Sequence, residues 1–406
     1  MVKDAVIERY QKRVAIQQVF RPGAPIERSD LFSGRLKQMQ TILSVIAQPG
    51  RHAALYGERG VGKTSLAKVM SEFLESSDPK ILISGTINCD GTDDFSSLWH
   101  KVFRELSLTM QMKGFGFGGM PPDARYTLDS MLNSEVRPDD IRFTLSQIRQ
   151  SIVILLDEFN SLLGRERVTG LLAETIKNIS DHTLNVTIII IGVADSVDEL
   201  IAGHGSVGRS LEQILMPRMT SEELHLIIKK ALAQIDMTME SGAEKWIVAL
   251  SKGLPHFTHL LSLDAALSAF DAERREITAH DVFAGIQSAA GNEHSLMKTY
   301  QDAITSPQKT NRFAEVLLAC ANAVTDGLGW FAPADICQPL SEVTDRPSDV
   351  PAFSRHLRAF CKRGILQSNK AAARKIRYRF ENPLMQPFVI LQAIRNARFE
   401  DQRIDF

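Results

Sequence analysis

The sequence predicts an α/β fold in which a parallel five-stranded sheet is followed by a helical region and a small C-terminal domain. Three observations support this prediction. Short apolar, β-branched runs without alternation recur in the first half of the chain, as expected of parallel strands that are covered on both faces. Amphipathic helical patterns separate these runs. From residue 219 onward the periodicity is almost entirely helical, and a length of 406 residues allows two to three domains.

The elements of the α/β part alternate between strand and helix. Leu66, Val69, Met70, Phe73 and Leu74 recur at helical spacing after the first strand. The apolar runs predict strands at residues 52–56, 80–89, 151–158, 185–194 and 211–216. The periodic segments between them predict helices at residues 97–110, 139–150 and 170–180.

The second half of the chain predicts helices and one hairpin. Thr220 and Glu223 form a capping box that opens a helix, and residues 244 to about 290 are helical only. After a polar connector at 305–311, three helical segments precede two strands around a short basic turn, which is the pattern of a winged helix. These five segments are residues 312–323, 333–340, 350–363, 365–368 and 373–380.

Residues 57–64 read G-E-R-G-V-G-K-T, a complete G-x-x-x-x-G-K-[ST] loop between a predicted strand and a predicted helix. The glycines let backbone N–H groups turn toward phosphates, Lys63 can reach the β and γ oxygens, and Thr64 can hold Mg²⁺. The alternative is a chance glycine-rich turn. The nucleotide-binding residues predicted from this loop are Gly57, Glu58, Arg59, Gly60, Val61, Gly62, Lys63, Thr64 and Ser65.

An acidic pair, Asp157 and Glu158, ends the third predicted strand. If this strand neighbours the first strand in a parallel sheet, the pair lies beside the phosphate loop. Asp157 would then accept from the Mg²⁺ water shell, while Glu158 would orient and activate the attacking water. The alternative is an exposed Asp-Glu pair without a role.

With these motifs the chain resembles the AAA+ ATPases, and within them the origin-recognition-like initiator clade and its bacterial relatives, from about residue 25 onward. Gly253-Leu-Pro255 resembles the STAND branch of signalling ATPases. The resemblance implies ATP or ADP with Mg²⁺ as cofactors. It also implies an N-terminal helical segment (1–24), an AAA+ nucleotide domain (25–218), a helical lid (219–304) and a winged-helix domain (305–406).

The resemblance further implies roles for residues outside the two motifs. Ile26 and Arg35 match the segment that lines the adenine side of the pocket. Asp195 takes the place of the polar sensor after the fourth strand, where relatives often carry Asn or Thr. Arg209 matches an arginine finger that reaches the active site of a neighbouring subunit, and His256 stands where the lid often contacts the nucleotide through an arginine.

Each of these four assignments has a plainer alternative. The segment with Ile26 and Arg35 could be an ordinary helix start, and Asp195 could cap a turn. Arg209 could be a solvated surface arginine. His256 could be a helix-capping or packing residue, and a mostly neutral histidine is a poorer phosphate ligand than arginine, which lowers the expected turnover.

Between residues 355 and 379, nine residues are Lys or Arg and none is Asp or Glu. This bias spans the predicted recognition helix and wing, where cations would contact DNA phosphates. The alternative is a solvated charged face on a winged helix that binds protein. The predicted DNA-binding residues are Arg355, Arg358, Lys362, Arg363, Lys370, Arg374, Lys375, Arg377 and Arg379.

Composition and charge narrow the kinds of partner, location and binding site that the chain can have. The formal charge is -1, so DNA affinity would have to come from a local patch. No apolar run approaches the roughly 20 residues of a membrane span, and the charged N-terminus predicts a cytoplasmic protein. The four cysteines have no C-x-x-C pair, which fits neither a disulfide framework nor a zinc site. The Gly-Phe segment at 113–122 predicts a loop to which we assign no site.

These observations lead to one main hypothesis and two alternatives. The main hypothesis is a slow, Mg²⁺-dependent ATPase switch that assembles as a homo-oligomer or with an ATPase partner and engages double-stranded DNA through the basic winged helix. One alternative is a STAND-type signalling or defence ATPase whose winged helix binds protein. The other is an ATP-dependent regulator of transposition or of a mobile element.

Overall fold

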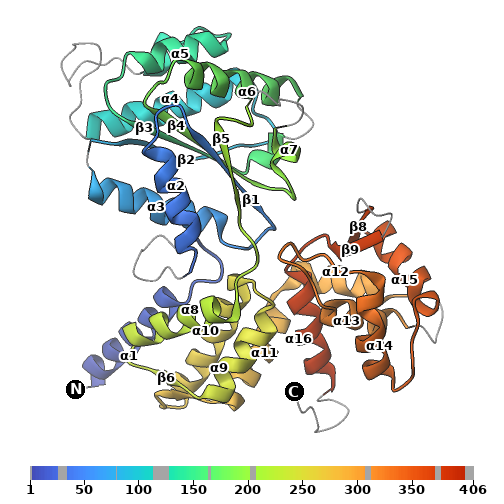
Figure 1. Cartoon of the computed structure of the whole chain (residues 1–406). Coiled ribbons are helices and arrows are strands. Elements are labelled where there is room, and N and C mark those ends of the chain that lie inside the picture. The colour runs from blue at the N-terminus through green and yellow to red at the C-terminus, as the bar shows by residue number, and fades with distance from the viewer. Residues whose placement is uncertain are drawn as a thin grey trace. The chain divides into compact units, whose positions relative to one another are not determined.

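The chain forms two compact units. The α/β unit contains residues 25–58 and 62–216, and the helical unit contains residues 1–24, 59–61 and 217–406. In the computed structural model of Figure 1, the described residues are 2–25, 34–78, 80–112, 128–162, 166–201, 207–306, 312–370 and 376–397.

The α/β unit is built on a five-stranded sheet with the strand order β2-β3-β4-β1-β5. Every neighbouring pair is parallel, which confirms the predicted five-stranded parallel sheet. Helices lie on both sides of the sheet (Figure 1), as parallel strands require. The strands are β1 (His52–Gly57), β2 (Leu82–Asn88), β3 (Ile152–Asp157), β4 (Val186–Val193) and β5 (Leu211–Leu215).

The first helix of this unit, α2, precedes β1, and the others connect successive strands. One group, α2 and α3, contacts the central strands, while α4 and α6 belong to a second layer with α5. The predicted helical segments are confirmed with shifted ends. The helices are α2 (Leu36–Ile46), α3 (Lys63–Ser77), α4 (Phe95–Met112), α5 (Pro138–Ser146), α6 (Glu166–Asp181) and α7 (Val197–Leu200), with short 3₁₀ turns η1 (Leu128–Met131) and η2 (Phe159–Leu162).

Alternating strand residues fill the two sides of the sheet. On β3, Ile152, Ile154 and Leu156 pack into the cluster that contains the α4 to α6 side chains, while Val153 and Leu155 are buried outside this cluster. This explains why the strands read as continuous apolar runs. The helical pattern of α3 is less complete than we expected, because Phe73 is 41% exposed.

The helical unit contains the lid helices and the C-terminal region. Thr220 caps α8 by accepting from Glu223 N at 3.3 Å, and Glu223 Oε2 accepts from Thr220 N at 3.0 Å, which confirms the capping box. Two short parallel strands that we did not expect, β6 (Thr238–Met239) and β7 (Glu276–Ile277), interrupt the helices. The helices are α1 (Val2–Val19), α8 (Ser221–Gln234), α9 (Ser241–Ser251), α10 (Pro255–Asp271), α11 (Ala279–Asn292) and α12 (His294–Ile304).

The C-terminal region has the helices and hairpin of a winged helix. Asp349 Oδ1 accepts from Ala352 N at 3.3 Å and caps the third helix. The antiparallel pair β8–β9 gains a bridge between Phe331 and Tyr378. The elements are α13 (Phe313–Asn322), η3 (Pro333–Ile336), α14 (Cys337–Thr344), α15 (Val350–Lys362), β8 (Leu366–Lys370) and β9 (Ile376–Phe380).

One helix that the sequence reading missed, α16 (Met385–Ala397), packs on helices of both the lid and the winged helix. The buried Gln386 donates to Ala321 O at 2.9 Å, and the buried Gln392 donates to Ala290 O at 2.8 Å. These bonds fasten α16 to α13 and α11. The four-part domain division therefore stays a prediction, since the lid and the winged helix belong to one compact unit.

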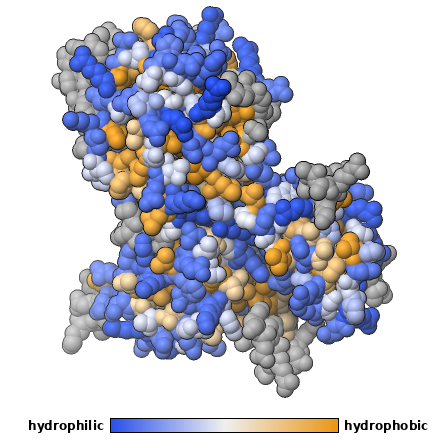
Figure 2. All heavy atoms as spheres, viewed as in Figure 1, coloured by the Kyte–Doolittle hydropathy of each residue, from blue (hydrophilic) through white to orange (hydrophobic). Residues whose placement is uncertain are grey.

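The surfaces seen in Figure 2 are mainly hydrophilic, with hydrophobic residues in separate smaller areas. Among the described residues, no helix is both long and apolar enough to cross a membrane.

Candidate nucleotide site

The predicted phosphate loop lies between β1 and α3. Gly62 is the residue before the helix and has φ 94°, and α3 begins at Lys63. Lys63 Nζ donates to Gly57 O at 3.0 Å and to Glu58 O at 2.8 Å, so the ammonium group lies over the start of the loop. The first N–H groups of α3 and the Lys63 charge therefore form an anion-binding position.

Gly57 is needed at the end of β1 because the chain passes close to the segment after β5. Its φ is 151°, and a Cβ there would overlap the carbonyl oxygen of Met216. Met216 N also donates to Tyr56 O at 2.7 Å. A side chain at position 57 would therefore displace the first residue of the loop.

Thr64 and Asp157, which are the predicted Mg²⁺ ligands, meet directly. Thr64 Oγ1 donates to Asp157 Oδ2 at 2.7 Å, and Asp157 is buried. The condition under which we placed them together, that the third strand neighbours the first, is not met, because β4 lies between β3 and β1. Thr64 and Asp157 meet nevertheless, because α3 contacts β2 and β4 as well as β1. Thr64, in the first turn of α3, therefore lies near the end of β3, where Asp157 is located.

The oxygen atoms of Thr64 and Asp157 fit Mg²⁺, which prefers hard oxygen ligands. A second carboxylate near this position, Asp93, pairs with Lys101 at 2.7 Å, which compensates part of the negative charge. The pKa of Cys89, whose N–H donates to Asp157 O at 2.8 Å, is raised to about 12 by burial and by the nearby charges of Asp93 and Asp157. A divalent cation would offset this negative charge. The residues present therefore fit a Mg²⁺–nucleotide complex.

Glu158 follows Asp157 and points its side chain into solvent. Its backbone is left-handed, with φ 55°. Glu158 N donates to the Asp157 carboxylate at 2.8 Å, and Glu158 O accepts from Ser161 N at 2.8 Å. A non-glycine residue in this conformation is held there by its surroundings, and such strain is common at functional sites.

The sequence reading missed Asn160, which lies in the 3₁₀ turn η2 after Glu158. Its Oδ1 accepts from Val193 N at 2.9 Å, at the last residue of β4. On either side of Asn160, Phe159 and Leu162 are fully buried and anchor the turn. The signal was a pair of polar residues, Asn160 and Ser161, between two apolar ones after the acidic pair. Asn160 therefore joins the Glu158 turn to the end of β4.

Asp195 lies two residues beyond β4, at the sheet edge where the phosphate loop begins, because Val193 pairs with Gly57 in the parallel register. The predicted place of this residue is confirmed, although its sensor role stays a prediction. Asp195 N donates to Glu199 Oε2 at 2.8 Å, which fixes the backbone of this turn. Three acidic residues thus lie at this edge: Asp157 is the last residue of β3, and Glu158 and Asp195 lie just beyond β3 and β4.

Two other predicted residues of the α/β unit lie outside this group. Arg35 precedes α2, is buried and has φ 62°. Arg209 is exposed just before β5. Ile26, the other candidate on the adenine side, and the Gly-Phe segment at 113–122 lie outside the described residues.

His256 lies in the first turn of α10, in the helical unit. Its Nδ1 is 2.8 Å from Pro22 O and its Nε2 is 3.8 Å from Glu293 Oε1. Before it, Gly253 has φ 78°, and a Cβ there would lie 2.8 Å from Arg218 Cβ. The described contacts of His256 thus join the N-terminal segment to the lid, and its predicted role in nucleotide binding stays a prediction.

The nine basic residues of the C-terminal region fall into three groups. Arg355, Arg358 and Lys362 are exposed on α15. Arg363, Arg377 and Arg379 make contacts within the unit. Arg374 and Lys375 lie outside the described residues, as does the side chain of Lys370.

The three arginines of the second group bind other residues of the helical unit. Arg363 Nη1 donates to Ala303 O at 2.5 Å. Arg377 pairs with Asp326 at 2.9 Å and donates to Trp330 O at 3.0 Å. The Arg379 guanidinium lies 4.4 Å from the centre of the Trp330 ring. These three arginines stabilise the winged helix.

The site and the fold together define a P-loop NTPase with the AAA+ architecture. Residues 25–328 match the family described as novel STAND NTPase 1. Because this match covers more than half of the chain, the protein belongs to that family of STAND-type P-loop NTPases.

Solved structures share this fold at low sequence identity. A Walker-type ATPase of Pyrococcus abyssi is 15% identical with a TM-score of 0.52, and the match covers 92% of this chain and 99% of that one. The ORC2 protein of Aeropyrum pernix, solved as ADPNP–ADP complexes, is 13% identical with a TM-score of 0.50, and the match covers 95% and 99% of the two chains. At these identities the likeness shows a common fold.

One curated relative matches a short part of the chain. An uncharacterised ABC transporter ATP-binding protein of Bacillus subtilis (strain 168), YfiC, is 36% identical over 87 residues, or 21% of this chain. The match spans 14% of the length of that relative.

Proposed function

We propose that this protein is an ATP-dependent switch that binds ATP with Mg²⁺ and hydrolyses it slowly. The observation that carries the proposal is the 2.7 Å contact between Thr64 and Asp157 beside the Lys63 ammonium. With nucleotide bound, Lys63 would donate to phosphate oxygens, and Thr64 and Asp157 would hold Mg²⁺. When bound, Mg²⁺ supplies neutralisation of the charge on the β- and γ-phosphates.

Glu158 is the proposed base of the hydrolytic step. Its exposed carboxylate follows the metal-binding Asp157 directly, so it can orient the attacking water and accept its proton. Asp195 is proposed to contact the water or the metal shell from the end of β4, and Arg35 with Ile26 to line the adenine side. His256 is proposed to contact the nucleotide when the lid engages it.

A Glu158→Gln protein tests the catalytic assignment. Turnover should fall roughly 100-fold or more, because a positioned base contributes about 10²–10⁴ to a rate, while ATP binding should remain. Glu174→Gln, an exposed carboxylate on α6, is the matched control and should leave turnover unchanged. Wild-type turnover in the Glu158→Gln protein would remove this residue from the mechanism.

Arg209 is proposed to reach the nucleotide site of a neighbouring subunit when subunits assemble. This exposed arginine precedes β5 and has the position from which the AAA+ family projects an arginine finger into a neighbouring subunit. A homo-oligomer or an ATPase partner would place the guanidinium near the γ-phosphate of the next site. Full ATPase activity in a strictly monomeric protein, measured by light scattering under assay conditions, would rule out this role.

Double-stranded DNA is the proposed partner of the winged helix. The supporting observation is that Arg355, Arg358 and Lys362 are exposed on α15, the recognition helix of the predicted motif. A second candidate is a protein partner, as in STAND-type signalling. One observation favours this second candidate: Arg363, Arg377 and Arg379 bind other groups of the helical unit, and Arg377 is paired with the carboxylate of Asp326.

A charge reversal distinguishes the two partners. Changing Arg355, Arg358 and Lys362 together to Glu should abolish any stimulation of ATP hydrolysis by duplex DNA and its salt dependence. The matched control reverses three exposed lysines elsewhere in the helical unit, Lys229, Lys245 and Lys298. Indifference of the wild-type ATPase to DNA at low salt would reject DNA and favour a protein partner.

A further inference from the structure

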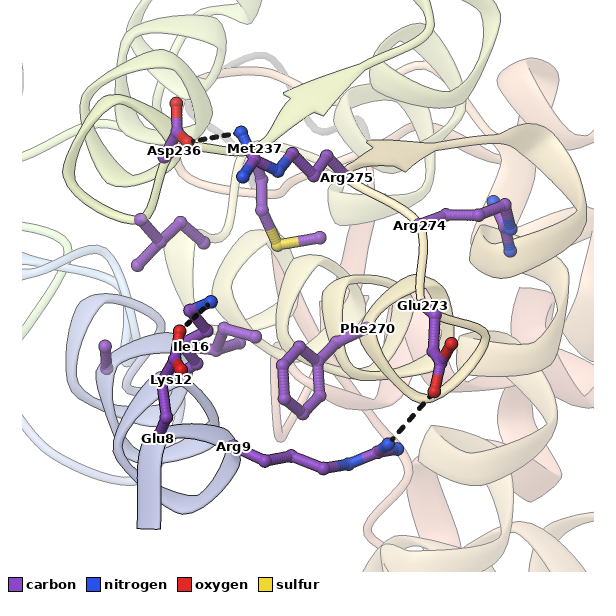
Figure 3. Close-up of a pocket in the computed structure, with 12 residues that line it drawn as sticks. Glu8, Arg9, Lys12, Ile16, Asp236, Met237, Phe270, Glu273, Arg274 and Arg275 are labelled. Carbon is purple, nitrogen blue, oxygen red and sulfur yellow. Dashed lines mark hydrogen bonds and ion pairs between the residues drawn. The ribbon is translucent and has the colours of Figure 1, made fainter. Parts of the chain in front are cut away.

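The helical unit contains a pocket that takes no part in the nucleotide site. Its volume is about 390 Å³, and it is lined by α1, by the segment from the end of α8 to β6, and by the segment from the end of α10 to β7 (Figure 3). Pockets for small ligands are typically about 300–1,000 Å³. The pocket is therefore large enough for a small organic molecule.

Apolar side chains from all three segments form one part of the wall. Ile16 of α1 and Met237 before β6 are buried, and the half-buried Phe270 ring of α10 lies between them and Arg9 in Figure 3. These groups offer an aliphatic and an aromatic surface to a ligand. Filling the space beside them would remove apolar surface from water, which is the main source of affinity in such pockets.

Cations stand at the margin of this apolar wall. The Arg9 guanidinium lies 5.4 Å from the centre of the Phe270 ring and 3.5 Å from Glu273. Lys12 pairs with Glu8 at 2.8 Å, and these four charged side chains are all at least half exposed. Arg9 also lies 3.7 Å from the half-exposed carboxylate of Asp271. Exposed ion pairs of this kind contribute about 0–1 kcal/mol, so an anionic ligand can replace these carboxylates at Arg9 at little cost.

The other two arginines that line the pocket are placed less favourably for a ligand that packs on Phe270. Arg274 holds the fully buried Asp281 through two contacts of 2.6 and 2.8 Å. Arg275 pairs with Asp236 at 2.8 Å on the far side of Met237 in Figure 3. Arg9 is therefore the cation that lies over the aromatic wall in an exposed ion pair.

We propose that this pocket binds a small amphipathic anion. The apolar body of the ligand packs on Ile16, Met237 and Phe270, and its carboxylate, sulfonate or phosphate group contacts Arg9. The site is independent of the proposed ATPase function, because its lining residues all belong to the helical unit.

A ligand bound in this pocket would hold the N-terminal helix α1 against the predicted lid. Ile16 and Val19, near the C-terminal end of α1, are buried, whereas residues 6–12 are exposed and contact α10 only through exposed side chains such as Arg9. A ligand that packs on Phe270 and contacts Arg9 would add buried contacts to this exposed part of the helix. Hydrogen exchange of the amides of residues 8–15 should therefore slow when the pocket is filled.

A pair of dyes tests the proposed chemistry. The anionic probe is 8-anilinonaphthalene-1-sulfonate, and N-phenyl-1-naphthylamine has the same ring system without the sulfonate. Phe270→Ala should weaken saturable binding of both dyes at least tenfold, and Ala15→Trp, which fills the pocket from α1, should abolish it. Arg9→Ala should weaken the anionic dye about three- to tenfold and leave the neutral dye unchanged.

Two controls separate this pocket from other apolar surface. Phe143→Ala removes a phenylalanine that is 55% exposed in the α/β unit and should leave both titrations unchanged. ATP binding and circular dichroism report whether each variant is folded. Phe270→Ala enlarges the pocket and Ala15→Trp fills it, so a single one of these two variants that folds is enough to test the proposal. Dye binding that ignores both changes, or an Arg9→Ala effect equal for the two dyes, would overturn the proposal.

Discussion

Sequence distance and spatial distance are related differently in the two units. In the α/β unit, Thr64 and Asp157 are far apart in sequence but lie 2.7 Å apart in space, because helix and strands carry them to one sheet edge. In the helical unit, nine basic residues share one stretch of sequence, yet Arg363 and Arg377 turn to separate partners within the fold. A motif placed on a parallel sheet defines a site, whereas a compositional bias alone does not.

Lys63→Ala should produce the largest effect on the α/β side of this comparison. Loss of the ammonium group removes a charged hydrogen-bond donor worth about 1.5–3 kcal/mol, so ATP affinity should fall roughly tenfold to a hundredfold. Titration with a fluorescent ATP analogue measures this change. Lys80→Ala, an exposed lysine of the same unit, is the control, and equal affinities in the two variants would contradict the assignment.

Gly253→Ala should produce the largest effect in the helical unit of this comparison. At φ 78° and with Arg218 Cβ and Met219 O 2.8 and 2.9 Å from the added Cβ, alanine should destabilise the unit by about 1–3 kcal/mol. Calorimetric unfolding gives the change. Gly242→Ala is a matched control, since a Cβ there has nothing within 4 Å. An equally stable Gly253→Ala protein would show that this turn tolerates a side chain.

Asn160→Ala should have a smaller effect, restricted to turnover. Val193 N loses its acceptor, a hydrogen bond worth about 1 kcal/mol, so kcat should fall about three- to tenfold with KM little changed. Asn160→Asp restores an acceptor oxygen and should recover most of the rate. A fall in stability without a change in kcat, or no recovery with Asp, would reduce Asn160 to a structural residue.

Mild acid should have the smallest effect, and it should act through buried histidines in both units. Burial, with the nearby Arg51 charge, lowers the pKa of His52 in β1 to about 3, and burial lowers that of His259 in α10 to about 4. Since an unfolded histidine titrates near pH 6.5, stability is complete above that pH and is lost as pH falls toward the folded pKa values.

For His52 alone this loss should reach about 1 kcal/mol between pH 7 and pH 5.5. Urea unfolding of the wild type and of His52→Gln, followed by a probe in the α/β unit, measures it. The variant should be less stable at pH 7, because His52 bonds Ser180 and Ile188, but should vary less with pH. Parallel pH profiles would contradict the assignment.

Local patterns predicted the strands, the capping box at Thr220 and the phosphate loop, because each depends on residues close in sequence. They could not give the strand order, in which β4 separates β3 from β1, since that depends on contacts between distant segments. The helix α16 was missed because its buried face includes polar residues, Gln386 and Gln392, whose partners lie elsewhere in the fold. Asn160 was missed for the same reason, because only the structure places it beside Val193.

The central claim is that Thr64 and Asp157 form the Mg²⁺ position of an ATP site. Calorimetric titration of ATP with and without Mg²⁺, in the wild type and in Thr64→Ala, tests this most directly. The wild type should bind ATP at least tenfold more tightly with Mg²⁺, and Thr64→Ala should lose most of that gain while its Mg²⁺-free affinity changes little. An equal Mg²⁺ gain in both proteins would contradict the account.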